Sequence, residues 1–291
     1  MDRSRSSRAR LRLSSRSMLV ETRRCGRLYV DVRGEGSPIV LWPSVLCSGA
    51  MWSSIPEELS RAHRVINIDG PGHGRSARVR EPYTLDDNVD AALAVLDACG
   101  VRRAVWCGLS WGAMVGMRLA LRAPERISGL VLIDGNADRE VPEKLPAYRA
   151  MAMISRVLGP IPPLLDRLEP IYFSPYSLRA NRPIVDAFRR GVASMDRESI
   201  RRAVDAVILG REDLRPQLPR IEAPTLVVVG ADDVATPRAR SEDIVSGIRG
   251  ARLVQIPRAG HLSAWEQPDA VREAIEGFLA TLAPQGARRT A

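Results

Sequence analysis

The sequence predicts an α/β fold, in which a doubly wound, mostly parallel sheet carries an inserted helical lid. Two observations lead to this prediction. Apolar runs rich in β-branched residues alternate with helical patterns, and the runs are continuous, as in strands that are buried on both faces of a parallel sheet. The alternation then lapses between about residues 137 and 219, where prolines and helical patterns replace the strands.

The elements can be placed in order along the chain. We expect strands at residues 28–32, 39–42, 65–69, 104–108, 130–134, 225–230 and 252–256. We expect helices at 85–99, 111–122, 237–247 and 268–282, and further helices within the lid at 184–192 and 199–209. The chain of 291 residues thus divides into a leader at 1–17, an α/β core at 18–136 and 220–291, and a lid at 137–219.

The leader differs most from an average globular composition. Residues 1–17 hold six arginines and one acid, so they contribute +5 of the net charge of +9. They lack the apolar stretch of a secretory signal, although their arginine and serine content resembles a transit peptide. A disordered tail, or a start codon upstream of the natural one at Met18, is the simpler interpretation. A nucleic-acid partner would rest on this leader alone, so we expect none.

The rest of the composition is typical of a globular protein that stays in the cytoplasm. Hydrophobic residues make up 45% of the chain and charged residues 26%. No apolar run approaches the roughly 20 residues that cross a bilayer, so we expect no membrane partner. The four cysteines form no C-x-x-C pair and the three histidines form no zinc pattern, which predicts a reduced protein without a metal.

The segment from Gly108 to Ala113, with the sequence Gly-Leu-Ser-Trp-Gly-Ala, is the strongest functional signal. It follows a predicted strand and opens a predicted helix, which is the context of a nucleophile elbow. Such a turn is strained and points the serine hydroxyl away from the sheet. Its glycines avoid collisions with the neighbouring backbone. Ser110 is therefore the candidate nucleophile.

A serine nucleophile needs a base, and the chain offers only three histidines. His261 follows the predicted strand at 252–256, so it would lie in a loop at the carboxyl end of a strand, where open α/β sheets place their sites. His63 precedes a strand and would lie at the opposite edge. The candidate base is therefore His261.

The base needs an acid that orients it. Asp232 and Asp233 follow the strand at 225–230, and the chain order nucleophile, acid, histidine fits both. Asp134, directly after the strand residues 130–133, is a third candidate. The chemistry of the residues alone leaves the choice open.

Five blocks of the sequence resemble the α/β-hydrolase family, and they lie at 39–52, 69–76, 108–113, 230–237 and 260–261. The block at 69–76 is similar to the structural turn D-x-P-G-x-G-x-S, so we do not expect its His73 to be the base. The block at 230–237 is similar to G-x-x-D-x-x-x-P, which aligns Asp233 with the catalytic acid. The resemblance thus implies the α/β-hydrolase fold and a catalytic triad of Ser110, Asp233 and His261.

The resemblance also implies an oxyanion hole, with one departure from the family pattern. Many members carry His-Gly after the first core strand, where the next backbone N–H helps to bind the oxyanion. Alignment on Met51 places Pro43 and Ser44 in those positions. The oxyanion hole would then consist of the backbone N–H groups of Val45 and Trp111.

These features imply a serine hydrolase that cleaves a carboxylic ester or lactone of a small to medium substrate through an acyl-enzyme on Ser110. No metal and no organic cofactor is needed. Ser44 and the segment 261–268 are similar to the 3-oxoadipate enol-lactonase branch of the family. The serine at the elbow excludes the haloalkane dehalogenase and epoxide hydrolase branches, which carry aspartate there.

Three other functions remain open at this stage, because fold-level likeness does not separate them. One is hydrolysis of a C–C bond in a dienoic diketone by the same triad. Another is perhydrolase or haloperoxidase activity. The third is a ligand-binding receptor with weak hydrolysis. The sequence fixes neither the substrate nor the oligomeric state.

The predicted lid should select the substrate, because it would cover the carboxyl ends of the strands. We expect most of its aromatic residues to pack the lid onto the core, and some to wall a pocket. Its arginines Arg149, Arg179 and Arg182 could hold a substrate carboxylate, although solvated positions are expected for each. The lid's aromatic and methionine residues are Tyr148, Tyr172, Phe173, Tyr176, Phe188, Met151 and Met153.

Overall fold

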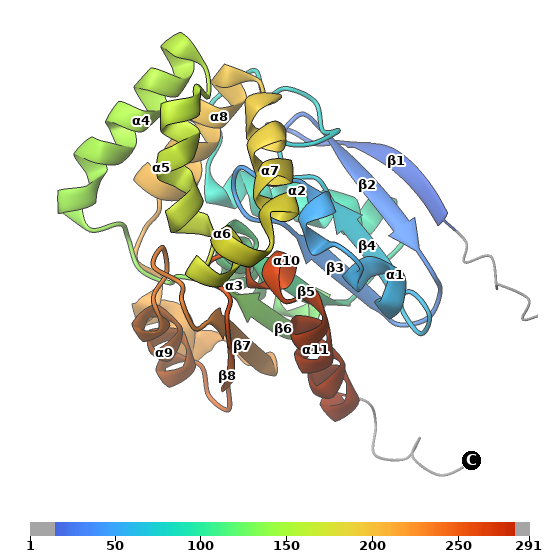
Figure 1. The fold of residues 1–291 in the computed structure, drawn as a ribbon. Helices are drawn as coiled ribbons and strands as arrows, with labels where there is room; N and C mark the ends of the chain where they lie inside the picture. The colour runs from blue at the N-terminus through green and yellow to red at the C-terminus, as the bar shows by residue number, and fades with distance from the viewer. Residues whose placement is uncertain (1–14, 283–291) are drawn as a thin grey trace, which may run out of the picture.

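The computed structural model describes residues 15–282, which form one eight-stranded sheet with helices on both faces (Figure 1). The strand order is β1-β2-β4-β3-β5-β6-β7-β8. Strands β3 to β8 run parallel to one another, whereas β1 and β2 pair antiparallel at one edge. The strands are β1 (Ser15–Glu21), β2 (Arg27–Arg33), β3 (Pro38–Trp42), β4 (Arg64–Ile68), β5 (Ala104–Leu109), β6 (Ile127–Ile133), β7 (Thr225–Gly230) and β8 (Arg252–Ile256).

The seven predicted strands are confirmed as β2 to β8, and the prediction of a doubly wound, mostly parallel α/β sheet is confirmed with them. Central strands such as β5 and β7 are buried along their whole length, which explains their continuous apolar runs. The four predicted core helices correspond to α2 (Leu85–Ala98), α3 (Trp111–Arg122), α9 (Arg238–Gly247) and α11 (Pro268–Leu282). Two short helices complete the core, α1 (Ile55–Leu59) and α10 (Ser263–Glu266).

Strand β1 corrects the predicted boundary of the leader. It begins at Ser15, so the last three residues of the segment 1–17 belong to the sheet. Sequence reasoning missed this strand because most of its side chains are exposed and only Val20 is buried. The strand forms through backbone pairing with β2, in which Met18 lies opposite Val30. Residues 1–14 lie outside the described residues.

The contacts of β6 show which helix covers each face of the sheet. A side chain at Gly129 would collide with Leu282 of α11, whereas Leu132 lies against Gly116 of α3. Because successive side chains of a strand point to opposite faces, α3 and α11 cover opposite faces of the sheet. The turn between β5 and α3, which carries the candidate nucleophile Ser110, is thus held between two packed layers.

The predicted insertion is confirmed as helical, and it leaves the core after β6 and returns before β7. In Figure 1 its helices form a layer of their own beside the sheet, with α4 outermost. The helices are α4 (Leu145–Leu158), α5 (Pro162–Tyr172), α6 (Pro175–Ala180), α7 (Arg182–Ala193) and α8 (Arg197–Val204), which continues into a π-helical turn, η4 (Asp205–Leu209). Short 3-10 helices lie at η1 (Gly49–Trp52), η2 (Pro124–Arg126), η3 (Pro142–Lys144) and η5 (Arg215–Arg220).

Two further findings concern the predicted environment of the protein. No helix within residues 15–282 has the length and apolar character to cross a membrane. The four cysteines are all buried free thiols. Burial raises the pKa of the Cys25 thiol to about 12, so this side chain packs as a small neutral residue.

Candidate active site

Ser110 lies on the sharp turn between β5 and α3, with φ of 52° and ψ of −100°. A side chain at Gly108 would lie 2.1 Å from the backbone of Gly112, and one at Gly112 would lie 2.3 Å from the carbonyl oxygen of Trp42. Only glycine fits at both places, which explains the G-x-S-x-G spacing. The backbone strain at Ser110 is the local feature expected of a nucleophile elbow.

The His261 side chain lies against this serine. Its Nε2 atom is 2.8 Å from the Ser110 hydroxyl oxygen, and both side chains are buried. The loop that carries His261 is fixed from two sides. Gly260 donates its backbone N–H to the Glu266 carboxylate at 2.7 Å, and Leu262 donates its N–H to the Tyr172 carbonyl oxygen at 3.1 Å. The insertion therefore helps to position the histidine.

Asp233 is the acid that reaches the histidine. Its Oδ2 atom lies 3.0 Å from His261 Nδ1, and its Oδ1 atom accepts backbone N–H groups from Ala235 at 2.8 Å and Thr236 at 2.9 Å. The side chain of Asp232 is exposed instead. The geometry thus distinguishes the two aspartates that chain order left equivalent.

Asp134, the third candidate acid, has other partners. Its carboxylate accepts the backbone N–H of Gly230 at 2.8 Å and the hydroxyl of Ser263 at 2.6 Å. It therefore ties the end of β6 to the end of β7 and to the segment after His261. Burial, together with the nearby Asp233 charge, raises the pKa of Asp134 well above its usual value.

The environment of His261 favours its protonated form. Burial alone lowers the pKa of the imidazole, but the Asp233 carboxylate, its hydrogen bond and the charges of Asp134 and Glu266 outweigh burial and raise the pKa above 6.5. A basic imidazole between a serine hydroxyl and a carboxylate can accept the serine proton and hold the resulting charge.

The predicted oxyanion residues lie next to Ser110. Val45 follows β3 in a loop that lines the same cavity as Ser110, and Trp111 is the first residue of α3. Within residues 15–282, the backbone N–H groups of Val45 and Trp111 have no hydrogen-bond partner. The Val45 carbonyl oxygen accepts the Tyr172 hydroxyl at 3.4 Å, so the insertion also holds this loop.

His73 and His63 are separate from the base. His73 Nε2 accepts the backbone N–H of Leu46 at 3.0 Å, while Nδ1 lies 2.8 Å from the Pro71 carbonyl oxygen. His73 is thus a structural residue beneath the Val45 loop, as the resemblance implies. His63 precedes β4, at the amino end of the parallel strands and far from Ser110.

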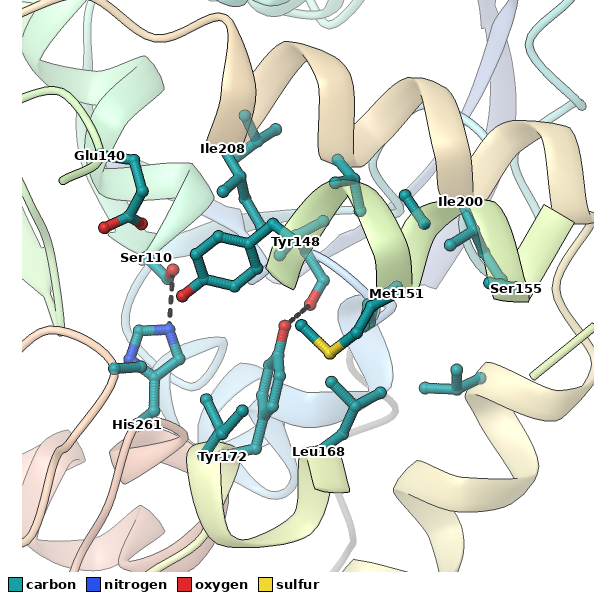
Figure 2. Close-up of a pocket in the computed structure, with 18 of the residues that line it drawn as sticks. Ser110, Glu140, Tyr148, Met151, Ser155, Leu168, Tyr172, Ile200, Ile208 and His261 are labelled. Carbon is teal, nitrogen blue, oxygen red and sulfur yellow. Dashed lines mark hydrogen bonds between the residues drawn. The ribbon is translucent and has the colours of Figure 1, made fainter. Parts of the chain in front are cut away.

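A cavity of about 100 Å³ adjoins Ser110 and His261 and is roofed by the insertion (Figure 2). Ile200 and Ser155 lie at the end remote from Ser110 in Figure 2, so that end carries the Ser155 hydroxyl beside an apolar side chain. Of the lid aromatics, Tyr148 and Tyr172 line the cavity, whereas Phe173 and Phe188 pack edge to face against each other. The apolar lining includes Met114, Met151, Ala152, Leu164, Leu168, Ile171, Val192, Ile200, Val204, Val207 and Ile208.

The charged residues that line this cavity were not identified from the sequence. Arg211 and Glu140 form a buried ion pair at 3.0 Å, and both line the cavity. Neither Arg149 nor Arg179 lines it, and both are exposed. Arg182 pairs with Glu169 at 2.9 Å on the outer side of the insertion. Across the described part of the chain, no group of three or more acidic, cysteine or histidine side chains is arranged to hold a metal.

Comparison with known proteins finds relatives along most of the chain. The model of the alpha/beta hydrolase family matches residues 39–274. A 3-oxoadipate enol-lactonase from Acinetobacter baylyi is 30% identical over 230 residues, which cover 79% of this chain and 84% of the enzyme. The chain is therefore distantly related to the enol-lactonase branch, as predicted.

Solved structures show the same relationship. An esterase from Thermogutta terrifontis superposes with a TM-score of 0.84 at 27% identity, covering 92% of this chain and all of the other. An enol-lactonase from Burkholderia xenovorans superposes with a TM-score of 0.81 at 30% identity, covering 87% of this chain and 96% of the other. Both are similar to this chain along nearly its whole described length.

Proposed function

Because the chain belongs to the alpha/beta hydrolase family, we propose that it is a serine hydrolase that cleaves a carboxylic ester or lactone of a small to medium substrate. The observation that carries the proposal is the unbroken hydrogen-bonded series from Asp233 through His261 to Ser110. These contacts measure 3.0 Å and 2.8 Å, within the range for a nucleophile and its base.

The reaction would proceed in two acyl-transfer steps. His261 accepts the proton of Ser110 as the hydroxyl oxygen attacks the substrate carbonyl, and then returns a proton to the leaving alkoxide. Water, activated by the same imidazole, cleaves the acyl-enzyme. Asp233 holds the imidazole in the tautomer with hydrogen on Nδ1 and stabilises its charged form.

The developing oxyanion would be bound by backbone groups. The N–H groups of Val45 and Trp111 have no partner within the described residues, so they are free to donate to an oxygen on the substrate. Each such donor is worth about 3 kcal/mol of transition-state stabilisation in comparable sites. The first helical turn of α3 adds its partial positive charge beneath the serine.

The related proteins favour ester and lactone substrates. The similar proteins include an esterase and two enol-lactonases, and in both substrate classes an alkoxide or enolate leaves a carbonyl carbon. A pure ligand receptor would need neither a basic imidazole at the serine nor two unoccupied N–H donors. The geometry therefore favours hydrolysis over binding alone.

The test is a labelling experiment combined with a substrate panel. A fluorophosphonate probe should label the wild-type protein, and Ser110→Ala should abolish the labelling. The panel contains p-nitrophenyl esters, simple lactones and 3-oxoadipate enol-lactone, and at least one ester or lactone should turn over. Labelling that survives Ser110→Ala would show that the nucleophile is another residue, and labelling without turnover of any ester or lactone would refute the assignment of the substrate class.

A further inference from the structure

The cavity beside Ser110 has one polar end, and two of its hydrogen-bond donors lack partners. The hydroxyl group of Tyr148 makes no hydrogen bond within residues 15–282. In Figure 2 the Tyr148 ring points toward Ser110 and His261, with the Glu140 carboxylate on the same side. A polar group placed among apolar side chains costs free energy unless it gains a partner. A substrate that is bound beside Ser110 can supply that partner.

Arg211 supplies the second donor. Its Nε atom donates to the Asp138 carbonyl oxygen at 3.0 Å and its Nη2 atom to Glu140 at 3.0 Å, but Nη1 has no partner among the described residues. Only 6% of the Arg211 side chain is exposed. Because Arg211 lines the cavity, Nη1 is available to donate to a group that is bound there.

The fold holds Arg211 in this place through an irregular helix end. Helix α8 widens into the π-helical turn η4, which closes with a 2.7 Å bond from the Gly210 N–H to the Asp205 carbonyl oxygen. Arg211 follows directly. Such π-helical turns occur frequently at functional sites, because they re-aim the residues around them.

The charges at this end of the cavity sum to zero. Both oxygens of Glu140 are occupied, one by Arg211 and the other by the Val141 N–H at 3.0 Å. Each carboxylate oxygen of Glu140 thus has one partner, whereas the Tyr148 hydroxyl and Arg211 Nη1 have none among the described residues. A substrate carboxylate would add a second negative charge beside Glu140 in a poorly solvated space, which is unfavourable. A neutral carbonyl oxygen brings no such charge.

We propose that Tyr148 and Arg211 select substrates that carry a neutral carbonyl group, of a ketone or an amide, close to the scissile ester or lactone bond. The aliphatic part of the substrate would then occupy the apolar end near Ile200. Glu140 is the residue that excludes carboxylates. This inference rests on the proposed hydrolase function and adds the substrate class of the same site.

The test compares butyl esters of matched length. Butyl pentanoate carries a methylene group at the fourth carbon, butyl levulinate a ketone, and monobutyl succinate a carboxylate. Butyl N-acetylglycinate presents an amide carbonyl and separates the amide from the ketone. The wild-type kcat/KM, followed by release of butanol, should be highest for a neutral carbonyl ester and lowest for the succinate. A preference for the pentanoate or the succinate over both carbonyl esters would overturn the inference.

Variants of Tyr148 and Glu140 test whether these two residues select the substrate. Tyr148→Phe removes only the hydroxyl group and should lower the carbonyl-to-pentanoate ratio of kcat/KM by about three- to tenfold, the effect of one hydrogen bond. Met153→Leu, at an exposed position of the same helix that does not line the cavity, is the matched control and should leave the ratio unchanged. Glu140→Gln leaves the Arg211 charge uncompensated, so it should raise kcat/KM for the succinate relative to the levulinate by about tenfold.

The outcomes separate this inference from the proposed function. The inference would be refuted if the carbonyl-to-pentanoate ratio of kcat/KM were equal in the wild type and Tyr148→Phe. It would also be refuted if Glu140→Gln did not raise kcat/KM for the succinate relative to the levulinate. In both cases the proposed ester hydrolysis would stand. If the wild-type protein cleaves a p-nitrophenyl ester or a lactone but none of the four butyl esters, the inference fails and the proposed function stands. If it cleaves no ester and no lactone, both fail.

Discussion

His73 accepts the backbone N–H of Leu46 through its Nε2 atom at 3.0 Å, which fixes the loop that carries the candidate oxyanion donor Val45. Because Nδ1 lies 2.8 Å from the Pro71 carbonyl oxygen, the proton must be on Nδ1 and the lone pair on Nε2. A second proton on Nε2 would break the bond to Leu46. Full burial lowers the pKa of His73 to about 4, even though the Pro71 carbonyl acts in the opposite direction.

We predict that His73 makes the protein less stable in acid. The unfolded chain takes up this proton near pH 6.5, whereas the folded chain does so near pH 4. The stability that depends on neutral His73 is therefore lost as the pH falls between these values, by about 3 kcal/mol in total. Urea unfolding at a series of pH values should show a shallower acid decline in His73→Asn than in the wild type.

The control for this prediction is His63→Asn. His63 is only partly buried, and burial lowers its pKa as well, but this side chain does not hold the Val45 loop. The acid decline should persist in this variant, and kcat should stay near the wild-type value. An equal acid decline in His73→Asn and in the wild type would contradict the argument.

A second prediction concerns the pH profile of turnover. Only the neutral form of His261 can accept the Ser110 proton, and the charge of Asp233 outweighs burial so that the pKa of His261 is raised above 6.5. For an uncharged ester, kcat/KM should rise with pH and reach half of its plateau above pH 6.5. A midpoint at or below that value would show that another group controls the acid limb.

A third prediction separates the two neighbouring aspartates. Asp233→Asn presents a different hydrogen-bonding group to His261 and should lower kcat on the order of a thousandfold or more. Asp232→Asn is the matched control, because this exposed side chain has no contact with the histidine, and it should lower kcat less than about twofold. A larger loss in Asp232→Asn than in Asp233→Asn would reverse the assignment.

The sequence predicted the strands that are buried on both faces, because burial leaves a continuous apolar run. It missed β1, whose side chains are mostly exposed and which is held by backbone pairing. Among the candidate site residues, Ser110 and His261 stand in local patterns that fix their place at strand ends. Arg211 and Glu140 do not: 71 residues separate them, and only the path of the insertion brings them together.

The directions of the side chains in the insertion also could not be predicted from the sequence. Helical patterning predicted that the lid would cover the site, but not which residues face the cavity. Phe173 is buried against Phe188 and Trp265, whereas Tyr148 lines the cavity. The two residues have the same aromatic character, so only tertiary packing distinguishes them.

A fourth prediction concerns the start of the folded chain. A chain shortened to begin at Met18 loses three residues of β1, including the pairings of Ser15 with Arg33 and Ser17 with Asp31. These residues lie at an exposed edge, so Tm should fall by only about 2–4 °C and kcat/KM should be unchanged. A chain that begins at Ser15 is the control and keeps all of β1. Equal Tm values for the two shortened chains would show that these pairings contribute nothing.

The last prediction concerns the length of the substrate chain. Ile200 lies at the end of the cavity remote from Ser110, and its side chain is buried (Figure 2). Shortening it should deepen the cavity and let longer acyl chains bury an additional methylene group, each worth about 0.8 kcal/mol. Across p-nitrophenyl esters of increasing length, Ile200→Ala should therefore raise kcat/KM for the longer esters relative to the shorter ones by about fourfold per accommodated methylene.

Two control variants distinguish an effect of the depth of the cavity from an effect of lower stability of the insertion. Ile200→Val removes less volume, costs about 1 kcal/mol of stability and should shift the preference in the same direction by a smaller factor. Phe173→Leu also disturbs the packing of the insertion, but Phe173 lies outside the cavity lining, so the length preference should stay at the wild-type value. If Phe173→Leu shifts the preference as much as Ile200→Ala does, the selection reflects the rigidity of the insertion. If neither variant shifts it, the remote end of the cavity does not bind the acyl chain.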